Sequence, residues 1–153
     1  MIPRLDYKAA SPAVYKAMLA METTVHQSGL EPSLLELVKM RSSQINGCAY
    51  CLDMHSKDAR AAGETEQRLH LLAAWHEAPV YSPRERAALA WTEAITLVAT
   101  NDLSDELYAQ VSAEFNEQEI VDLTLAIITI NGWNRLNAAF RTEVGGYQPA
   151  ATH

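Results

Sequence analysis

The stretch "EIVDLTLAIITI" (residues 119–130) decides the fold class, because it is the one segment that fits either a strand or a helix. Its β-branched residues would suit a buried strand. Asn116 and Glu119, however, form the pair expected at the start of a capped helix. Apolar residues then recur at helical spacing at Ile120, Leu123, Ile127, Leu136 and Phe140. The sequence therefore predicts a helix here, and since no second strand candidate is available for pairing, it predicts an all-α protein.

Upstream of this stretch, start signals divide the chain into further helices. Proline opens two segments, at Pro12 and Pro32, and Ser82 with Pro83 and Glu85 marks a third start. We expect about six or seven helices in all. The earlier ones are predicted over residues 12–27, 32–45, 48–62, 64–78, 82–100 and 104–115.

Length and charge restrict the class of protein. A chain of 153 residues with an ordinary apolar fraction is expected to form one domain, over residues 1–153, with a frayed tail after Gly146. Twelve basic and nineteen acidic residues give a net charge of −7. This charge argues against a nucleic-acid or membrane surface and favours small-molecule or protein partners. The sequence shows neither a membrane span nor a signal-peptide pattern, so we expect a cytoplasmic protein.

The stretch "NGCAYCLDMH" (residues 46–55) contains the only two cysteines, and it could be a metal clip, a structural staple or a redox centre. On a helix, Cys51 lies about 60° around the axis from Cys48, and His55 about 40° from Cys51, so the three share one face. A disulfide between the cysteines would close a very small loop and stabilise little. The spacing therefore favours a reversible redox pair over a staple.

The position of the pair also favours reactivity. The start of a helix stabilises a thiolate, and His55 lies one turn beyond Cys51, where it can accept the thiol proton. Glu36, on the preceding helix, is the candidate that would orient this imidazole. Glu36 has an alternative role of comparable weight, because Ser33 and Glu36 have the spacing of a capping box.

Together these residues resemble the signature of the AhpD-like alkylhydroperoxidases, in the carboxymuconolactone decarboxylase superfamily. That signature is a glutamate, eleven residues, and then Cys-x-x-Cys-x-x-x-His, and it is matched by Glu36, Cys48, Cys51 and His55. The segments "SPRERAALAWTEAIT" and "EIVDLTLAIITINGWNRLNAAF" are similar to later helices of the family. The resemblance covers roughly residues 30–142.

The resemblance implies an all-helical, single-domain fold that assembles into a homotrimer or homohexamer. It also implies peroxide reduction in antioxidant defence, with Cys51 as the attacking thiol, Cys48 as the resolving thiol, and Glu36 with His55 as a proton relay. The implied reductant is a dithiol, either lipoyl-type or thioredoxin-like, and no bound cofactor is required. The chain departs from the best-studied branch at Tyr50, where that branch has a histidine before the second cysteine.

Two alternatives use the same residues. Glu36, Cys48, Cys51 and His55 could bind zinc, although structural zinc sites usually take a second cysteine or histidine pair downstream, and none follows here. The cysteines could also act in a non-enzymatic redox-sensing module. Trp133 is expected in the core or at a subunit interface rather than at a site.

Overall fold

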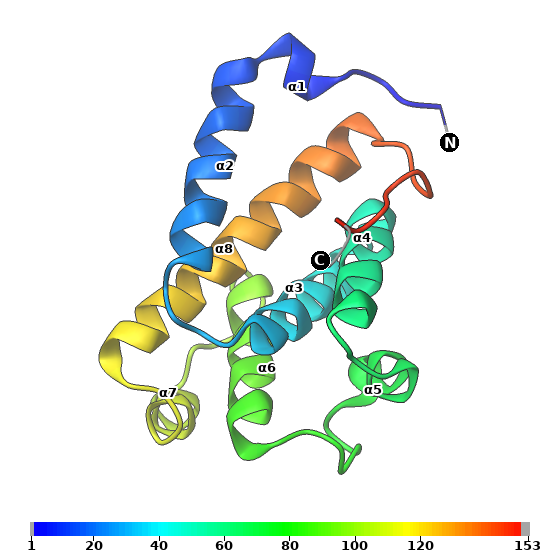
Figure 1. Ribbon diagram of the computed structural model, residues 1–153. Helices are drawn as coiled ribbons and strands as arrows, with labels where there is room; N and C mark the ends of the chain where they lie inside the picture. Colours follow the sequence, from blue (N-terminus) through cyan, green and yellow to red (C-terminus); the bar gives the residue numbers. More distant parts are fainter. Residues whose placement is uncertain (1, 151–153) are drawn as a thin grey trace.

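The computed structural model describes residues 2–150 and is all-helical over that range (Figure 1). The prediction of an all-α fold is confirmed, and each of the seven predicted segments contains a helix. One further four-residue helix, α1, precedes them. The elements are α1 (Tyr7–Ala10), α2 (Pro12–His26), α3 (Pro32–Asn46), α4 (Ala49–Ala61), α5 (Glu66–Leu71), the short 3-10 helix η1 (Leu72–Ala74), α6 (Pro83–Thr96), α7 (Asp105–Ser112) and α8 (Glu117–Phe140).

The strand-like stretch forms the first half of α8, the longest helix of residues 2–150. Its predicted capping box is present, because the Asn116 side chain accepts from the N–H of Glu119 and the Glu119 carboxylate accepts from the N–H of Asn116. α8 runs diagonally through Figure 1 and packs against α2, α3 and α6. These neighbours bury Ile120, Ile127 and Ile130, whereas Val121 and Ile128 stay exposed, so burial within this chain accounts for only part of a sequence that is apolar around most of the helix.

The main apolar core lies between α3, α6 and α8. Its largest buried members include Val38, Leu123 and Ile127, whose side chains are fully removed from solvent. A second cluster, with Leu37, Leu72 and Leu89, holds α5 and η1 against α3 and α6. Both clusters contain residues of α3 and hold this helix in place. The polar side chains of α3, such as Glu36 and Lys39, are therefore attached to a rigid helix.

Only two residues, Gly47 and Cys48, connect helix α3 to helix α4, and both helices carry residues of the site. Gly47 ends α3 in the left-handed conformation (φ 64°, ψ 33°), which glycine adopts without steric cost. Its N–H and that of Cys48 bond to the last carbonyl groups of α3, at Gln44 and Ser43. The next helix therefore begins within two residues, and α3 and α4 lie side by side.

Helix α2 lies against α8 through a close approach at Gly132. A Cβ atom on Gly132 would lie 2.8 Å from the Cε atom of Met18, so the absence of a side chain there lets the two helices approach. Within residues 2–150, no helix is both long and apolar enough to cross a membrane.

Candidate active site

The two cysteines lie at the start of α4. Cys48 is the N-cap residue rather than part of the first turn, and its sulfur accepts a hydrogen bond from the backbone N–H of Cys51 at 3.4 Å. The two sulfur atoms are joined in a disulfide, with 5.4 Å between the Cα atoms. Both residues are buried, and Ile130 of α8 packs against them. The cysteines are thus joined in the oxidised form, and in the reduced form the start of α4 would stabilise their thiolates.

Glu36 meets His55 across the α3–α4 contact. The distance between Glu36 Oε2 and His55 Nδ1 is 3.0 Å, and the His55 side chain is only 7% exposed. The alternative in which Glu36 closes a capping box with Ser33 is wrong, because α3 starts at the N-cap Glu31 with Pro32 in the first turn. A carboxylate at Nδ1 holds the proton on that nitrogen, which leaves Nε2 as the basic atom of the ring.

Behind this pair stands a buried charge network that reaches α2. Lys39 is 3% exposed, and its Nζ atom lies 2.5 Å from Glu22 Oε1 and 3.8 Å from Glu36 Oε1. Glu22 also accepts a hydrogen bond from Trp133 Nε1 at 3.1 Å. Burial raises the pKa of Glu22, but the charge and hydrogen bond of Lys39 and the bond from Trp133 outweigh it and lower the pKa from 4.5. Glu22 therefore stays ionised and balances the Lys39 ammonium.

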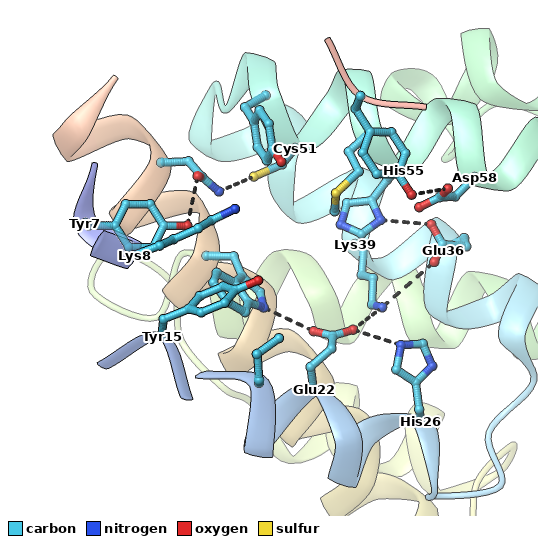
Figure 2. A pocket seen from close by; sticks show the side chains of 16 residues that line it. Tyr7, Lys8, Tyr15, Glu22, His26, Glu36, Lys39, Cys51, His55 and Asp58 are labelled. Carbon is cyan, nitrogen blue, oxygen red and sulfur yellow. Dashed lines mark hydrogen bonds and ion pairs between the residues drawn. The ribbon is translucent and has the colours of Figure 1, made fainter. Parts of the chain in front are cut away.

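A cavity of about 410 Å³ brings these groups together (Figure 2). Among the described residues, Cys51, His55 and Glu36 line it, whereas Cys48 does not. Much of the remaining wall is aromatic, from Tyr7, Tyr15, Tyr50, Trp133 and Tyr147. A ligand in this space would contact the Cys51 side of the disulfide, between aromatic side chains and charged groups that include Glu36, Lys39 and Glu22.

Tyr147 closes one side of the cavity, so at this residue the prediction of a frayed tail is wrong; residues 151–153 of that tail lie outside the described residues. The hydroxyl of Tyr147 donates to Asp58 Oδ1 at 2.7 Å, and Lys57 Nζ donates to the Tyr147 carbonyl at 3.0 Å. Burial, followed by the hydrogen bond and charge of Asp58, raises the pKa of Tyr147 to about 12. Tyr147 is therefore a neutral donor at physiological pH, and it ties residues beyond α8 to the outer face of α4.

The zinc alternative finds no support in the arrangement of donors. Within residues 2–150, no three His, Cys, Asp or Glu side chains are grouped so that they could hold a metal ion. Glu36 and His55 contact each other instead, and the two cysteine sulfurs bond to each other.

Several residues of the site were missed in the sequence because they carry no motif. Lys39 follows Glu36 by three residues, and helical spacing alone would place the two side by side. Glu22 and Trp133, by contrast, reach the network only through tertiary packing of α2 and α8. Trp133 was expected in the core or at an interface, yet it forms part of the cavity wall.

Comparison with known proteins identifies relatives along most of the chain. Residues 12–94 match the sequence model of the carboxymuconolactone decarboxylase family. Uncharacterized protein YdfG of Bacillus subtilis is 47% identical over 139 residues, which are 91% of this chain and 95% of YdfG.

Solved structures agree with this assignment. An Agrobacterium tumefaciens protein of unknown function, described as a putative antioxidant defence protein AhpD, is 42% identical with a TM-score of 0.92. The match covers 95% of this chain and 100% of that one. The debrominase Bmp8 is only 22% identical but has a TM-score of 0.78 over 88% of this chain and 73% of its own, so it shares the fold. Because the family model matches more than half of the chain and YdfG is 47% identical, this chain belongs to the carboxymuconolactone decarboxylase family, as an AhpD-like member.

Proposed function

We propose that this protein is an enzyme, a thiol-dependent peroxidase that reduces hydroperoxides through Cys48 and Cys51 in antioxidant defence. The observation that carries the proposal is the shared cavity, since Cys51, His55 and Glu36 all line it and Cys51 is bonded to Cys48. A thiol nucleophile needs a nearby base that is itself held in orientation, and this arrangement supplies one. The resemblance to the putative antioxidant defence protein of A. tumefaciens supports the same class of activity.

In the first step, His55 takes the proton of the Cys51 thiol through its basic Nε2 atom. The Cys51 thiolate attacks the terminal oxygen of the hydroperoxide, and the O–O bond breaks. The departing alkoxide takes the proton back from the imidazolium and leaves as an alcohol, while Cys51 becomes a sulfenic acid. Glu36 stabilises the imidazolium while it carries the charge. That Cys51 lines the cavity and Cys48 does not supports Cys51 as the attacking residue.

In the second step, the Cys48 thiol gives up its proton, and the resulting thiolate attacks the Cys51 sulfenic sulfur. The expelled hydroxide takes up that proton and leaves as water. The product is the Cys48–Cys51 disulfide. Residues three apart at a helix start reach this state with little movement, as the 5.4 Å between their Cα atoms indicates.

The third step returns two electrons and two protons from an external dithiol. We propose that a lipoyl-type or thioredoxin-like donor attacks Cys51, the sulfur on the cavity side, so that Cys48 leaves as a thiolate. The second thiol of the donor then attacks the donor sulfur of this mixed disulfide, and Cys51 leaves as a thiolate. The N–H of Cys51 already points at the Cys48 sulfur and would stabilise that leaving group. Such a cycle requires a compartment that supplies reducing thiols, which is consistent with the expected cytoplasmic location.

A steady-state assay with hydrogen peroxide or cumene hydroperoxide and excess dithiol tests the proposal. We expect multiple turnovers in wild type and none in Cys51→Ser. Cys48→Ser is the matched control, because without added dithiol it should consume one equivalent of peroxide and accumulate a Cys51 sulfenic acid that dimedone traps. A single oxidation without turnover in wild type would instead indicate a redox sensor, and stoichiometric zinc with unreactive thiols would indicate a metal site.

A further inference from the structure

A buried amide of α8 points at the sulfur of Cys51. Asn137 Nδ2 lies 3.5 Å from Cys51 Sγ, and the two residues are 5% and 1% exposed. They stand 86 positions apart in the chain and meet only through the packing of α4 on α8. The contact therefore places a polar donor, with little access to water, against the atom that is proposed to react.

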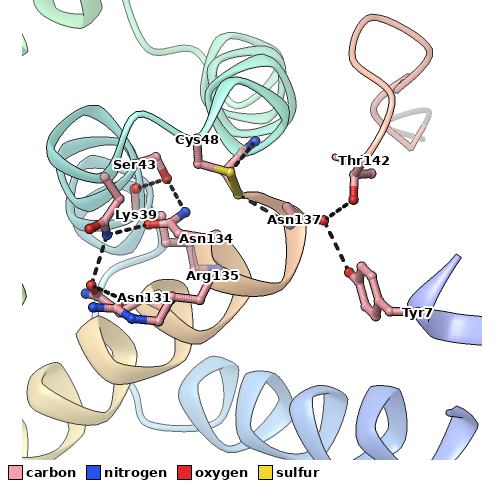
Figure 3. The surroundings of a disulfide bond; sticks show 11 residues. Tyr7, Lys39, Ser43, Cys48, Asn131, Asn134, Arg135, Asn137 and Thr142 are labelled. Carbon is pink, nitrogen blue, oxygen red and sulfur yellow. Dashed lines mark hydrogen bonds between the residues drawn. A yellow bond between two sulfur atoms is a disulfide. The ribbon is translucent and has the colours of Figure 1, made fainter. Parts of the chain in front are cut away.

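The orientation of this amide is set by two hydroxyl groups (Figure 3). Asn137 Oδ1 accepts from the Tyr7 hydroxyl at 3.2 Å and from Thr142 Oγ1 at 2.8 Å. Two donors occupy the two lone pairs of the carbonyl oxygen, so the NH₂ group is turned towards the sulfur. The reversed amide would set the carbonyl oxygen against Cys51, which is repulsive once the sulfur carries a negative charge.

Thr142 reaches Asn137 because the chain reverses at the end of α8. Arg141 adopts the left-handed conformation (φ 55°, ψ 56°), and the N–H of Thr142 bonds back to the Asn137 carbonyl at 3.1 Å. Tyr7 arrives from α1, at the other end of the chain. Segments from both ends of the chain thus hold one amide.

We propose that Asn137 donates a hydrogen bond to the Cys51 thiolate, and that Tyr7 and Thr142 are positioning residues that hold the amide for this purpose. A thiolate that is 1% exposed has lost most of its hydration, and a donor fixed beside it replaces part of that solvation. His55 and Asn137 then have separate tasks, since His55 takes the proton away and Asn137 stabilises the charge that remains. The inference rests on the proposed role of Cys51 as the attacking thiol.

The test is the pH dependence of Cys51 alkylation by iodoacetamide, measured in a Cys48→Ser background so that only one thiol reacts. Asn137→Leu, which is close to isosteric, should raise the midpoint of this profile by about one pH unit, the order expected for a lost hydrogen bond to a charged group. Asn134→Leu is the matched control, because Asn134 is equally buried on α8 but bonds to Ser43 and Asn46. That control should destabilise the fold and leave the midpoint unchanged.

A separate variant tests whether Tyr7 and Thr142 position the Asn137 amide. The Tyr7→Phe/Thr142→Val double substitution keeps Asn137 but frees its amide to rotate, so the midpoint should rise by less than in Asn137→Leu. A folded Asn137→Leu protein with the wild-type midpoint would overturn the proposal. An unchanged midpoint in the double variant alone would overturn the part assigned to Tyr7 and Thr142.

A measurement on the wild-type sequence covers the case in which Asn137→Leu does not fold. In reduced protein with ¹⁵N-labelled asparagine, the Asn137 side-chain amide resonances should shift with the same midpoint as the alkylation of Cys51, and those of Asn134 should not. Asn137 side-chain amide resonances that do not shift with pH would contradict the proposal. Neither experiment requires peroxide turnover, so a failure of the peroxidase assay and a failure of this inference are distinguishable.

Discussion

His55 and Glu36 come from consecutive helices and meet at 3.0 Å between Nδ1 and Oε2. The contact gives Glu36 a partner inside the protein, since Ser33 does not cap α3. It also determines which nitrogen of His55 is basic, and therefore which one can serve the thiol. The same carboxylate faces Lys39 on its other side, with 3.8 Å between Glu36 Oε1 and Lys39 Nζ.

Glu36→Gln should lower kcat/KM for peroxide about 100-fold, because a neutral amide cannot stabilise the His55 imidazolium. Steady-state kinetics with a circular-dichroism check of folding would measure this. Ser33→Ala, one turn earlier on α3, is the matched control and should keep both activity and stability. Full activity in Glu36→Gln would remove Glu36 from the relay.

Lys39→Met should destabilise the protein by about 3–5 kcal/mol, because it removes the buried ammonium that faces the Glu22 and Glu36 carboxylates. Urea unfolding measures the loss. Adding Glu22→Gln to Lys39→Met should recover part of it, as expected for a coupled pair. Lys57→Met is the control, since the Lys57–Asp53 pair is partly exposed and should contribute less than about 1 kcal/mol. Equal losses in the two lysine variants would contradict the buried-network interpretation.

The change of the unfolding free energy with pH should reflect the titration of the Glu22 carboxyl group. The folded state lowers the pKa of this carboxyl, chiefly through the charge of Lys39, which overcomes the opposing effect of burial. Its contribution is therefore fully present above its unfolded pKa near 4.5 and is lost as the pH falls through the lower folded value. The difference in unfolding free energy between wild type and Glu22→Gln should be constant near neutrality and shrink below about pH 4.5. A difference that grew on acidification would have the wrong sign.

The outer face of α8 is the proposed contact between subunits. Val121 and Ile128 are seven residues apart, which places them on one face of the helix, and they are 68% and 49% exposed. We propose that they pack against other copies of this chain in a homotrimer or homohexamer. The Val121→Glu/Ile128→Glu variant should sediment as a monomer in analytical ultracentrifugation, while Val144→Glu, a change at an equally exposed apolar residue outside the helix, should not. An unchanged mass in the double variant would place the interface elsewhere.

Most helices were predictable because their starts are local. The pairs Ser82–Glu85 and Asn116–Glu119 both form capping boxes, and a hydrogen bond over three residues needs no information from the rest of the chain. α1 was not predictable in the same way. It has four residues, too few for a periodic pattern, and although Asp6 caps its start, Ala9 three residues later cannot complete a capping box.

The residues of the site were also predictable only where they lie close together in the sequence. Cys48, Cys51 and His55 could be selected by their spacing on one helix, and the resemblance to the family signature added Glu36. The structure does bring Glu36 to His55 and Cys48 to Cys51. The contact of Asn137 with Cys51 depends instead on how α8 crosses α4. No local pattern encodes that crossing, so this partner required the folded structure.

Because the turn at Gly47 is so short, the number of residues between Glu36 and Cys48 determines how the two side chains are oriented relative to each other. Because α3 ends and α4 begins within two residues, inserting one residue between Glu36 and Gly47 would rotate Glu36 by about 100° around α3 and carry its carboxylate away from His55. Point substitutions within this interval would keep the register, whereas insertions and deletions would break it. The eleven residues between Glu36 and Cys48 therefore belong to the site through their number as much as through their side chains.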